Sequence, residues 1–366
     1  MVLNIRYDLK HSPQRRNEQF IPDKALPFGK LRTDHMFVMN YDGESWVNPR
    51  IVPYGDLSIP PGAVCLNYGQ GIFEGAKAFK HPDEEMYTFR INENAKRMNI
   101  SAEIMCIPQI PEEDQIEGIH SLIDVDRLWF PEKQNGASMY IRPLIVGTED
   151  GLGVKPSKTY TFCVFLSPSG PYYAEGFTKP IKLLITKKYH RAVPGGSGSA
   201  KAAGNYGASL RVGRFAQSFG AAQTLYLDTT NTYIEEAGAM NHFHVTADGT
   251  IIIPEFTDTI LESITAKSVL DLGEHLKVGA RQERIALDDF VLKIKDMEIM
   301  EAGGLGTAAV VTAVGGYIFE DGRELQVGQG DIGEITRRIY ETITGIQTGI
   351  LNGPEGWMQR VERKSF

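Results

Sequence analysis

A stretch near the middle of the chain that is rich in proline, glycine and serine constrains the fold most. Residues 167–176 read SPSGPYYAEG, a composition typical of a linker rather than of the interior of a helix or strand. A chain of 366 residues is long enough for two domains. We therefore expect a smaller N-terminal domain over residues 1–168, an interdomain loop over 169–180 and a larger domain over 181–366.

Helices and strands are expected in both halves, without regular alternation. The first half contains a predicted hairpin over 36–47 with its turn at Asp42-Gly43, helices over 69–79 and 92–105 and after Pro111, and strands over 137–146 and 159–166. The second half contains predicted strands over 181–186, 224–253 and 304–319, and helices over 206–219, 263–276 and 332–343. A doubly wound parallel sheet needs strict alternation, so we expect an α+β fold.

Composition excludes several classes of partner. The 38 lysines and arginines against 46 acidic residues give a net charge of −8, which favours neither a nucleic acid nor a membrane surface. No apolar run approaches a membrane span, and no signal pattern opens the chain. The three cysteines lie far apart without metal spacing, so we expect reduced thiols, no metal and a cytoplasmic protein.

Lys201 is the first candidate for chemistry. It lies within GGSGSAKAAGNY, residues 195–206, and such small neighbours let a flat, bulky ligand approach the backbone closely. A lysine held against such a ligand loses water, so its pKa falls and it can act as a nucleophile or base. A flexible loop with a solvated lysine is the alternative that this segment alone leaves open.

Two phosphate-binding motifs can be tested against the glycine-rich segments. A P-loop requires Gly-Lys-Ser/Thr, whereas Lys201 stands between two alanines. Residues 304–309, GLGTAA, match GxGxxA, but the β-branched run that follows favours a strand over the helix of a dinucleotide site. We therefore expect a tight turn whose N–H groups and Thr307 hydroxyl bind a phosphate or a carboxylate.

Several further residues complete a set that pyridoxal phosphate chemistry requires. Besides Lys201 and the Thr307 turn, the chain has Glu235-Glu236, Arg97, and Tyr140 and Arg142 on one strand face. The cofactor needs a lysine that forms an imine, a group that sets the protonation of the pyridine nitrogen, and donors for the phosphate. Each residue alone also suits an exposed helix, a solvated strand end or a half-buried strand face; their joint presence favours the cofactor.

The chain resembles the branched-chain amino acid aminotransferases, which are fold-type IV pyridoxal phosphate enzymes, over nearly its whole length. The stretches that carry the resemblance are NYGQGIFEGAKAF (67–79), KRM (96–98), YIRP (140–143), AK (200–201), GNY (204–206), EAGAMN (236–241), TILESIT (259–265) and GTAA (306–309). The resemblance implies two α/β domains, of which the larger C-terminal one is barrel-like.

The resemblance implies a role for each cofactor residue. Lys201 is the lysine that is joined to the cofactor and that later moves a proton. Glu236 pairs with the pyridine nitrogen, and Tyr206 hydrogen-bonds the ring oxygen. The phosphate is expected to meet Arg97, the N–H groups of Ile264 and Thr265 at a helix start, and Thr307.

The substrate residues follow from the same resemblance. The Thr307-Ala308 turn, helped by Tyr68, is expected to bind the α-carboxylate. Some relatives have a threonine at position 239, so Ala239 leaves a contact there undecided. Phe73, Tyr140 and Tyr172 are expected to form the apolar side-chain pocket, and Arg142 to receive the distal carboxylate of glutamate. Tyr172 lies in the expected linker, which would act as a lid.

The implied activity is reversible transamination of L-leucine, L-isoleucine and L-valine with 2-oxoglutarate, which gives branched-chain 2-oxo acids and L-glutamate by a ping-pong route. The implied partners are these small molecules and further copies of the chain, in a homodimer or larger homo-oligomer. Two alternatives remain: another fold-type IV enzyme (a D-amino acid or (R)-amine transaminase, or an aminodeoxychorismate lyase), and a cofactor-binding protein without turnover. Sequence leaves the substrate ranking and the direction, synthesis or breakdown, open.

Overall fold

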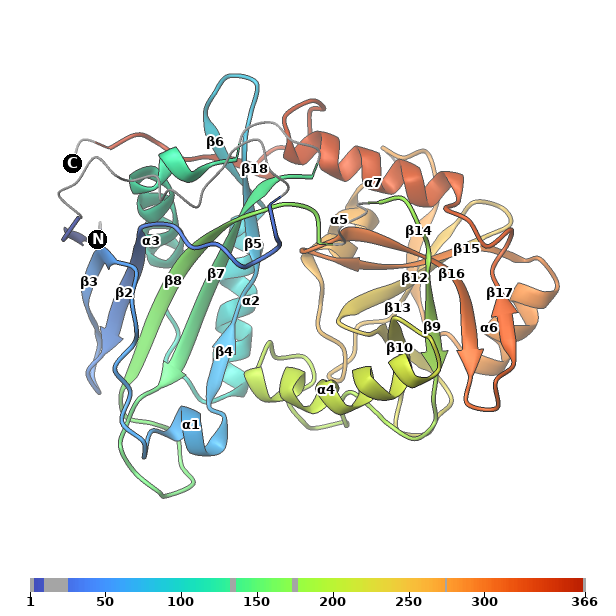
Figure 1. Cartoon of the computed structure of the whole chain (residues 1–366), viewed down its shortest axis with the longest axis horizontal. Helices are drawn as coiled ribbons and strands as arrows, with labels where there is room; N and C mark the ends of the chain where they lie inside the picture. The colour runs from blue at the N-terminus through green and yellow to red at the C-terminus, as the bar shows by residue number, and fades with distance from the viewer. Residues whose placement is uncertain (1–2, 10–25, 132–135, 173–176, 274, 365–366) are drawn as a thin grey trace. The chain divides into compact units, whose positions relative to one another are not determined.

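The computed structural model describes residues 3–9, 26–131, 136–172, 177–273 and 275–364, and the chain divides into two compact units (Figure 1). Unit 1 comprises Met1–Ala174, Ala200–Gly204 and Gly345–Phe366. Unit 2 comprises Glu175–Ser199 and Asn205–Thr344. Lys201 therefore belongs to unit 1, although most of the chain around it belongs to unit 2. Part of the expected lid, residues 173–176, lies outside the described residues.

Unit 1 is built on one large sheet, most of which is antiparallel. Its strands are β1 (Arg6–Tyr7), β2 (His35–Tyr41), β3 (Trp46–Pro53), β4 (Gly71–Phe73), β5 (Ala76–Lys80), β6 (Met86–Phe89), β7 (Ser138–Gly147), β8 (Tyr160–Ser169) and β18 (Met358–Arg360). Their order is β1-β3-β2-β8-β7-β5-β6-β18, with β4 also paired to β7. The expected hairpin at Asp42-Gly43 is confirmed, because β2 and β3 pair antiparallel across it.

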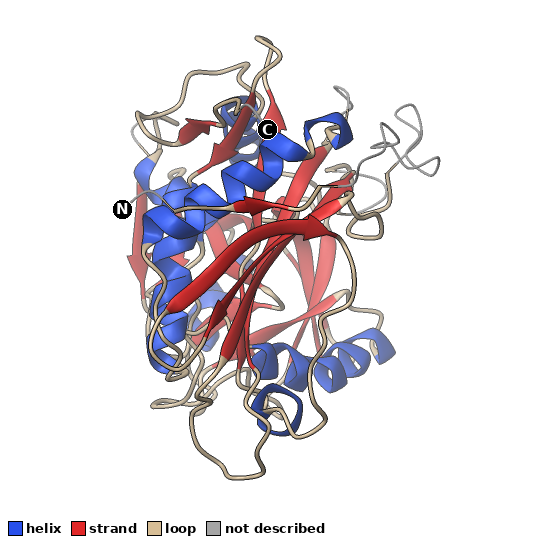
Figure 2. Cartoon of the chain, turned by 90° about the vertical axis from the view of Figure 1, so that its left-hand side faces the viewer, coloured by secondary structure: helices blue, strands red, loops and turns tan. Residues whose placement is uncertain are grey.

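Helices cover one face of this sheet (Figure 2). The covering helices are α2 (Ile91–Ile104) and α3 (Glu112–Val125); α3 contacts β2 and β8, and α2 contacts α3 and β4. The short helix α1 (Val64–Tyr68) lies at the end of the strands (Figure 1), and the 3-10 helix η1 (Arg127–Trp129) follows α3. Burial alternates along β7, so Met139 and Ile141 enter the apolar core while Tyr140 and Arg142 lie on the other face. The face of β7 that points away from the apolar core therefore carries the polar side chains of Tyr140 and Arg142.

One expected helix is wrong. Residues 69–79 form β4 and β5, interrupted at Glu74-Gly75, instead of a helix. Both strands pair antiparallel with β7, with Phe73 opposite Leu144 and Ala76 opposite Ile141. The spacing of apolar residues in this segment is compatible with either period, and long-range pairing with β7 decides in favour of strands.

Unit 2 contains a closed barrel. The strands β11 (Ile234–Ala237), β10 (Gln223–Leu227), β9 (Ile181–Ile185), β16 (Val310–Phe319), β15 (Ile299–Gly306) and β12 (Met240–Thr246) pair in that order, and β12 pairs back to β11. Three further strands extend it: β13 (Ile251–Pro254), β14 (Ala280–Glu283) and β17 (Glu324–Gln326). The barrel-like form expected of the second half is therefore confirmed.

The helices that belong mainly to unit 2 are α4 (Ala203–Ser218), α5 (Ile264–Asp271), α6 (Leu287–Lys295) and α7 (Glu334–Gln347). The Ser263 hydroxyl accepts from the N–H of Ala266 at 3.3 Å, which caps α5 at its start. Phe290 of α6 joins Leu183, Leu225 and Tyr317 in an apolar core. Helices and mostly antiparallel strands mix in both units, as the α+β expectation requires.

Candidate active site

The segment that carries Lys201 is attached to β4 by backbone hydrogen bonds. Ile72 forms an antiparallel bridge with Ala202, and the N–H of Phe73 donates to the carbonyl of Lys201 at 3.1 Å. The N–H of Lys201 donates to the hydroxyl of Ser101, on α2, at 2.9 Å. These bonds give the lysine a fixed backbone, which contradicts the alternative of a flexible glycine-serine loop.

The amine of Lys201 lies in a partly dehydrated and cationic environment. Its Nζ is 4.8 Å from the centre of the Phe73 ring. Burial and the positive charge of Arg97 lower the pKa of Lys201, and the negative charge of Glu74 partly opposes them. The resulting pKa is about 8. At pH 7 roughly one amine in ten is then neutral, against roughly one in three thousand for an ordinary lysine. Lys201 is therefore suited to act as a nucleophile and as a base.

Arg97 is held by Glu74. The arginine donates from Nε to Oε1 at 2.7 Å and from Nη2 to Oε2 at 2.8 Å, and both side chains are buried. Asn94 Nδ2 and the N–H of Gly75 also donate to Glu74 Oε2, at 2.8 and 3.0 Å. Burial would raise the pKa of Glu74, but Arg97, with help from Lys201, outweighs it and holds the pKa below its usual value.

Tyr140 and Arg142 lie together on the polar face of β7. Arg142 Nη2 donates to the Tyr140 hydroxyl at 3.1 Å, and its guanidinium carbon is 4.9 Å from the centre of the Phe73 ring. A Cβ at Gly75 would collide with the Tyr140 hydroxyl, so only glycine allows this approach. The structure thus brings together Lys201, Phe73, Tyr140 and Arg142, as the sequence predicts.

Phe28 is a member of this cluster that sequence reasoning missed. Its ring lies edge-on to Tyr140 and to Tyr172, with centroids 5.1 Å apart in each case. Phe28 comes from the polar N-terminal segment, where a lone aromatic residue carries no periodic signal. Glu74 was also missed as a functional residue, although it stands inside the NYGQGIFEGAKAF stretch.

Tyr68, expected to help with the α-carboxylate, lies on α1. It is partly exposed, and its hydroxyl donates to the carbonyl of Leu152. This hydrogen bond ties the Tyr68 side chain to the segment after β7.

Glu236 lies on β11 of unit 2 and is buried, with hydrogen-bond donors around its carboxylate. Arg191 Nε lies 2.9 Å from its Oε2, and Asn241 Nδ2 and the N–H of Leu261 donate to its Oε1 at 3.1 and 2.9 Å. A carboxylate with these donors is fixed as a hydrogen-bond acceptor. It can therefore accept from a protonated ring nitrogen.

Two backbone features of unit 2 suit anions. Ile264 and Thr265 form the first turn of α5, where N–H groups point outward and the helix dipole favours negative charge. Thr307–Ala309 form the turn between β15 and β16. A strand follows this turn, so the expected turn is confirmed and the dinucleotide alternative is excluded.

The two remaining positions named from the sequence also lie in unit 2. Tyr206 is half-buried in the first turns of α4. Ala239 is exposed in the turn between β11 and β12, and its N–H donates to Gln223 Oε1 at 3.0 Å. The backbone at this turn is thus fixed by Gln223 even without a hydroxyl at position 239.

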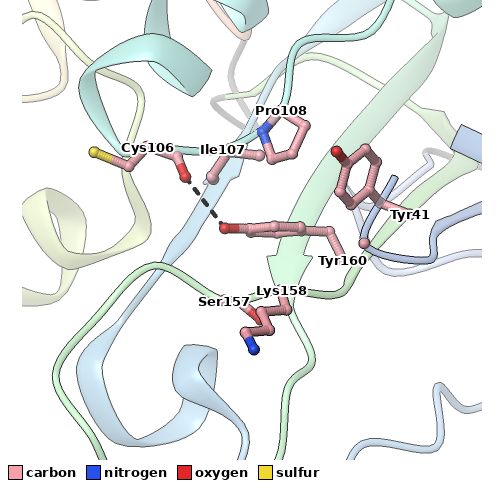
Figure 3. A pocket seen from close by; sticks show the side chains of 8 residues that line it. Tyr41, Cys106, Ile107, Pro108, Ser157, Lys158 and Tyr160 are labelled. Atoms are coloured by element: carbon pink, nitrogen blue, oxygen red, sulfur yellow. Dashed lines mark hydrogen bonds between the residues drawn. The ribbon is translucent and has the colours of Figure 1, made fainter. Parts of the chain in front are cut away.

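Unit 1 also has a cavity of about 640 Å³ that contains none of the predicted site residues (Figure 3). Its walls include Tyr41, Cys106, Lys158 and Tyr160, and the Tyr160 hydroxyl donates to the carbonyl of Cys106 at 3.1 Å. Gln70 Nε2 lies 3.2 Å from the Tyr160 hydroxyl. Gln70, the residue directly before β4, therefore contacts this cavity wall.

Over the ranges that the structure describes, no helix is long and apolar enough to cross a membrane. In the same ranges, no group of three or more histidines, cysteines or acidic residues is arranged to hold a metal ion. His242 and His244, two apart on β12, are both buried.

Comparison with known proteins places these features in context. A family model described as Amino-transferase class IV matches residues 71–313. The Branched-chain-amino-acid aminotransferase 2 of Bacillus subtilis (strain 168) is 44% identical over 343 residues, which cover 93% of this chain and 93% of that protein.

Two solved structures are similar as well. The Escherichia coli branched-chain amino acid aminotransferase has a TM-score of 0.74 at 27% identity, over 89% of this chain and 99% of that one. A branched-chain amino acid aminotransferase from T.th., solved in complex with N-(5'-phosphopyridoxyl)-L-glutamate, has a TM-score of 0.70 at 27% identity, over 89% and 98%. The fold of this chain is therefore fold-type IV.

Proposed function

The chain belongs to the class IV aminotransferases, in the group that acts on branched-chain amino acids, and we propose that it transfers the amino group reversibly between L-leucine, L-isoleucine or L-valine and 2-oxoglutarate. The observation that carries the proposal is Lys201, an amine with a lowered pKa on a fixed backbone beside the Glu74–Arg97 pair. Membership of the family supplies the reaction class, and this amine supplies the group that the reaction needs.

We propose pyridoxal 5'-phosphate as the cofactor. The residues present suit it: an amine for covalent attachment (Lys201), a fixed carboxylate acceptor (Glu236) and a helix start for the phosphate (Ile264 and Thr265). When bound, the cofactor withdraws electrons from the substrate Cα–H bond. Arg97 would bind the phosphate, and Glu74 would hold the plane of the Arg97 guanidinium. Thr307 would also bind the phosphate, and Tyr206 would hydrogen-bond the ring oxygen.

The chain's own groups then handle protons and orientation. Lys201 Nζ takes the Cα proton and returns it, for which a pKa near 8 is well placed because a neutral amine exists at working pH. With the cofactor bound, the Glu236 carboxylate would accept a hydrogen bond from the ring nitrogen and so favour its protonated form. The Thr307-Ala308 turn orients the α-carboxylate.

The substrate pocket must accept an apolar side chain and a carboxylate in turn. Phe73, Tyr140, Tyr172 and Phe28 supply apolar surface, while Arg142 at the Tyr140 hydroxyl supplies a cation. We propose that leucine contacts the rings and that the distal carboxylate of glutamate reaches Arg142. The ring contact of Arg142 with Phe73 keeps the guanidinium in place when no carboxylate is present.

We propose a homodimer or larger homo-oligomer in the cytoplasm. In support, α1 and the segment after β7 carry large exposed apolar residues: Leu66 is 62% exposed, Leu152 74% and Val154 84%. A cluster of this kind suits contact with a second copy of the chain. Tyr68 stands in the same cluster, so assembly would bury a residue that the sequence assigns to the substrate.

Lys201→Ala tests the proposal. Purified with pyridoxal phosphate, the variant should lose the absorbance at ~410 nm that the cofactor joined to a lysine gives, and nearly all transamination of L-leucine. Lys187 is exposed, and Lys187→Ala should retain both properties. A Lys201→Ala protein that kept both properties would refute the assignment. L-Leucine and D-alanine, each with 2-oxoglutarate, separate this activity from that of a D-amino acid transaminase, and a single half-turnover with L-leucine excludes a binding protein without activity.

A further inference from the structure

Val310 has a backbone conformation that valine rarely adopts. Its φ is +65°, and a β-branched residue in this region is a true outlier. The N–H of Val311 donates to the carbonyl of Ala309 at 2.9 Å, which closes a three-residue turn around Val310. Because φ is positive, this turn is the rare and strained form of the γ-turn and not the common inverse form.

The surrounding structure holds Val310 in this conformation. It pairs with Gly306 at the end of the β15–β16 ladder, which continues through Leu305–Val311 and Gly304–Thr312. Its side chain is buried in unit 2. Strain of this kind persists only where neighbouring structure over-determines it, and it is concentrated at binding sites.

The strained residue directly follows the Thr307–Ala309 turn. In short hairpin loops the left-handed position usually belongs to glycine or asparagine, because these residues adopt it with little cost. This chain has neither between Thr307 and Val310. A glycine would allow the loop many conformations, whereas a buried valine limits them.

We propose that Val310 is a positioning residue for carboxylate binding: its strained γ-turn fixes the direction in which the N–H groups of the Thr307-Ala308 turn point. This inference rests on the proposed function of that turn. The ligand class is the α-carboxylate common to amino acids and 2-oxo acids. Val310 therefore acts on every substrate alike, in contrast to Arg142, which acts on the distal carboxylate of glutamate alone.

The test compares Val310→Gly with Val310→Ala in the holoenzyme. Both lose buried methyl groups, but only glycine relieves the positive φ. Val310→Gly should melt at a higher temperature than Val310→Ala, the reverse of the usual order. It should also raise the KM for L-leucine and L-glutamate, and the Kd for 4-methylpentanoate measured by calorimetry, all by about tenfold, as expected when binding groups are misdirected. Val310→Ala, which keeps the strained positive φ, should raise these constants several-fold less than Val310→Gly does.

Met297 offers a matched control. It also has a positive φ, +60°, in unit 2, just before β15, and its side chain is exposed. Met297→Gly should melt above Met297→Ala without a change in KM or in Kd. An unchanged Kd in Val310→Gly, or equal changes in both Val310 variants, would overturn the inference. Failure of the wild type to transaminate L-leucine would instead refute the proposed function.

Discussion

Glu74 and Arg97 form a doubly hydrogen-bonded ion pair, with N–O distances of 2.7 and 2.8 Å, beside the amine of Lys201. Burial of either charge alone would be costly, because neither is solvated. The pair also sets the field at the lysine, since Arg97 lowers the pKa of Lys201 and Glu74 raises it. Glu74 thus has two roles: it holds Arg97 and moderates its effect on Lys201.

Glu74→Gln tests both roles. Removing one partner of a buried pair leaves an uncompensated charge, so the free energy of unfolding should fall by about 3 kcal/mol. The pKa of Lys201 should fall below its present value of about 8, because a negative charge that raises it is lost. Urea denaturation measures the first effect, and the pH dependence of cofactor capture by absorbance measures the second.

Glu84→Gln is the control for this experiment. Its ion pair with Lys80 lies at the surface, where such pairs contribute little. It should leave both measurements near the wild-type values. A Glu74→Gln protein with an unchanged pKa for Lys201 would contradict the electrostatic role of Glu74.

Gly75→Ala should separate the two kinds of substrate. The new Cβ would strike the Tyr140 hydroxyl and displace it, which breaks the hydrogen bond from Arg142. We expect the KM for L-glutamate to rise by about tenfold and that for L-leucine by less, since one charged hydrogen bond is misplaced. Steady-state kinetics with each amino donor measures the ratio.

A glycine with room for a methyl group is the matched control. A Cβ added to Gly213, in α4, would meet no atom within 4 Å, so Gly213→Ala should leave both KM values unchanged and stabilise the helix slightly. An equal rise of both KM values in Gly75→Ala would show that the position shapes the whole pocket rather than the Arg142 contact.

Local patterns predicted much of the fold correctly. Ser263 identified the start of α5 because a serine before an apolar run is a helix-cap signal, and the β-branched residues after Ala309 identified β16. The helix predicted over residues 69–79 was wrong because this segment forms strands that depend on pairing with β7, some 70 residues later. No local pattern contains that information.

The site was predictable to the extent that its residues occur in short motifs. Lys201, Tyr140 and Arg142 were named from the sequence and lie together with Phe73. Phe28 and the Glu74–Arg97 pairing were not predicted, because both are contacts between distant segments without spacing rules. The rare conformation of Val310 was also invisible, since valine normally favours extended strands.

Lys77→Met should stabilise the protein near neutral pH. Lys77 lies on β5 opposite Tyr140, and its burial lowers its pKa to about 8. Between pH 8 and 10.5 the unfolded chain binds a proton that the folded chain has lost, so stability rises with pH in that window. The variant should gain up to about 3 kcal/mol at pH 7 and lose this slope. Urea denaturation from pH 7 to 10.5 measures both; a wild-type curve that is flat above pH 8 would contradict the prediction.

His242→Leu should reduce the acid sensitivity of unit 2. Within the described structure, Nδ1 and Nε2 of His242 are buried without a hydrogen-bond partner, and its ring lies 5.4 Å from that of Phe290. Burial lowers the pKa of His242 well below 6.5, and it lowers that of its neighbour His244 to about 3. As the pH falls below about 6.5, these histidines therefore bind protons in the unfolded chain but not in the folded one. The free energy of unfolding declines as a result.

Leucine at position 242 removes one of these proton sites and two unpaired nitrogen atoms. The free energy of unfolding should rise by about 1–2 kcal/mol at pH 7, and its decline between pH 6.5 and 4 should become shallower. The exposed His275→Leu serves as the control and should change neither quantity. Thermal melts at half-unit pH steps measure both, and a His242→Leu curve parallel to that of the wild type would mean that His242 is protonated in the folded chain or paired with buried water.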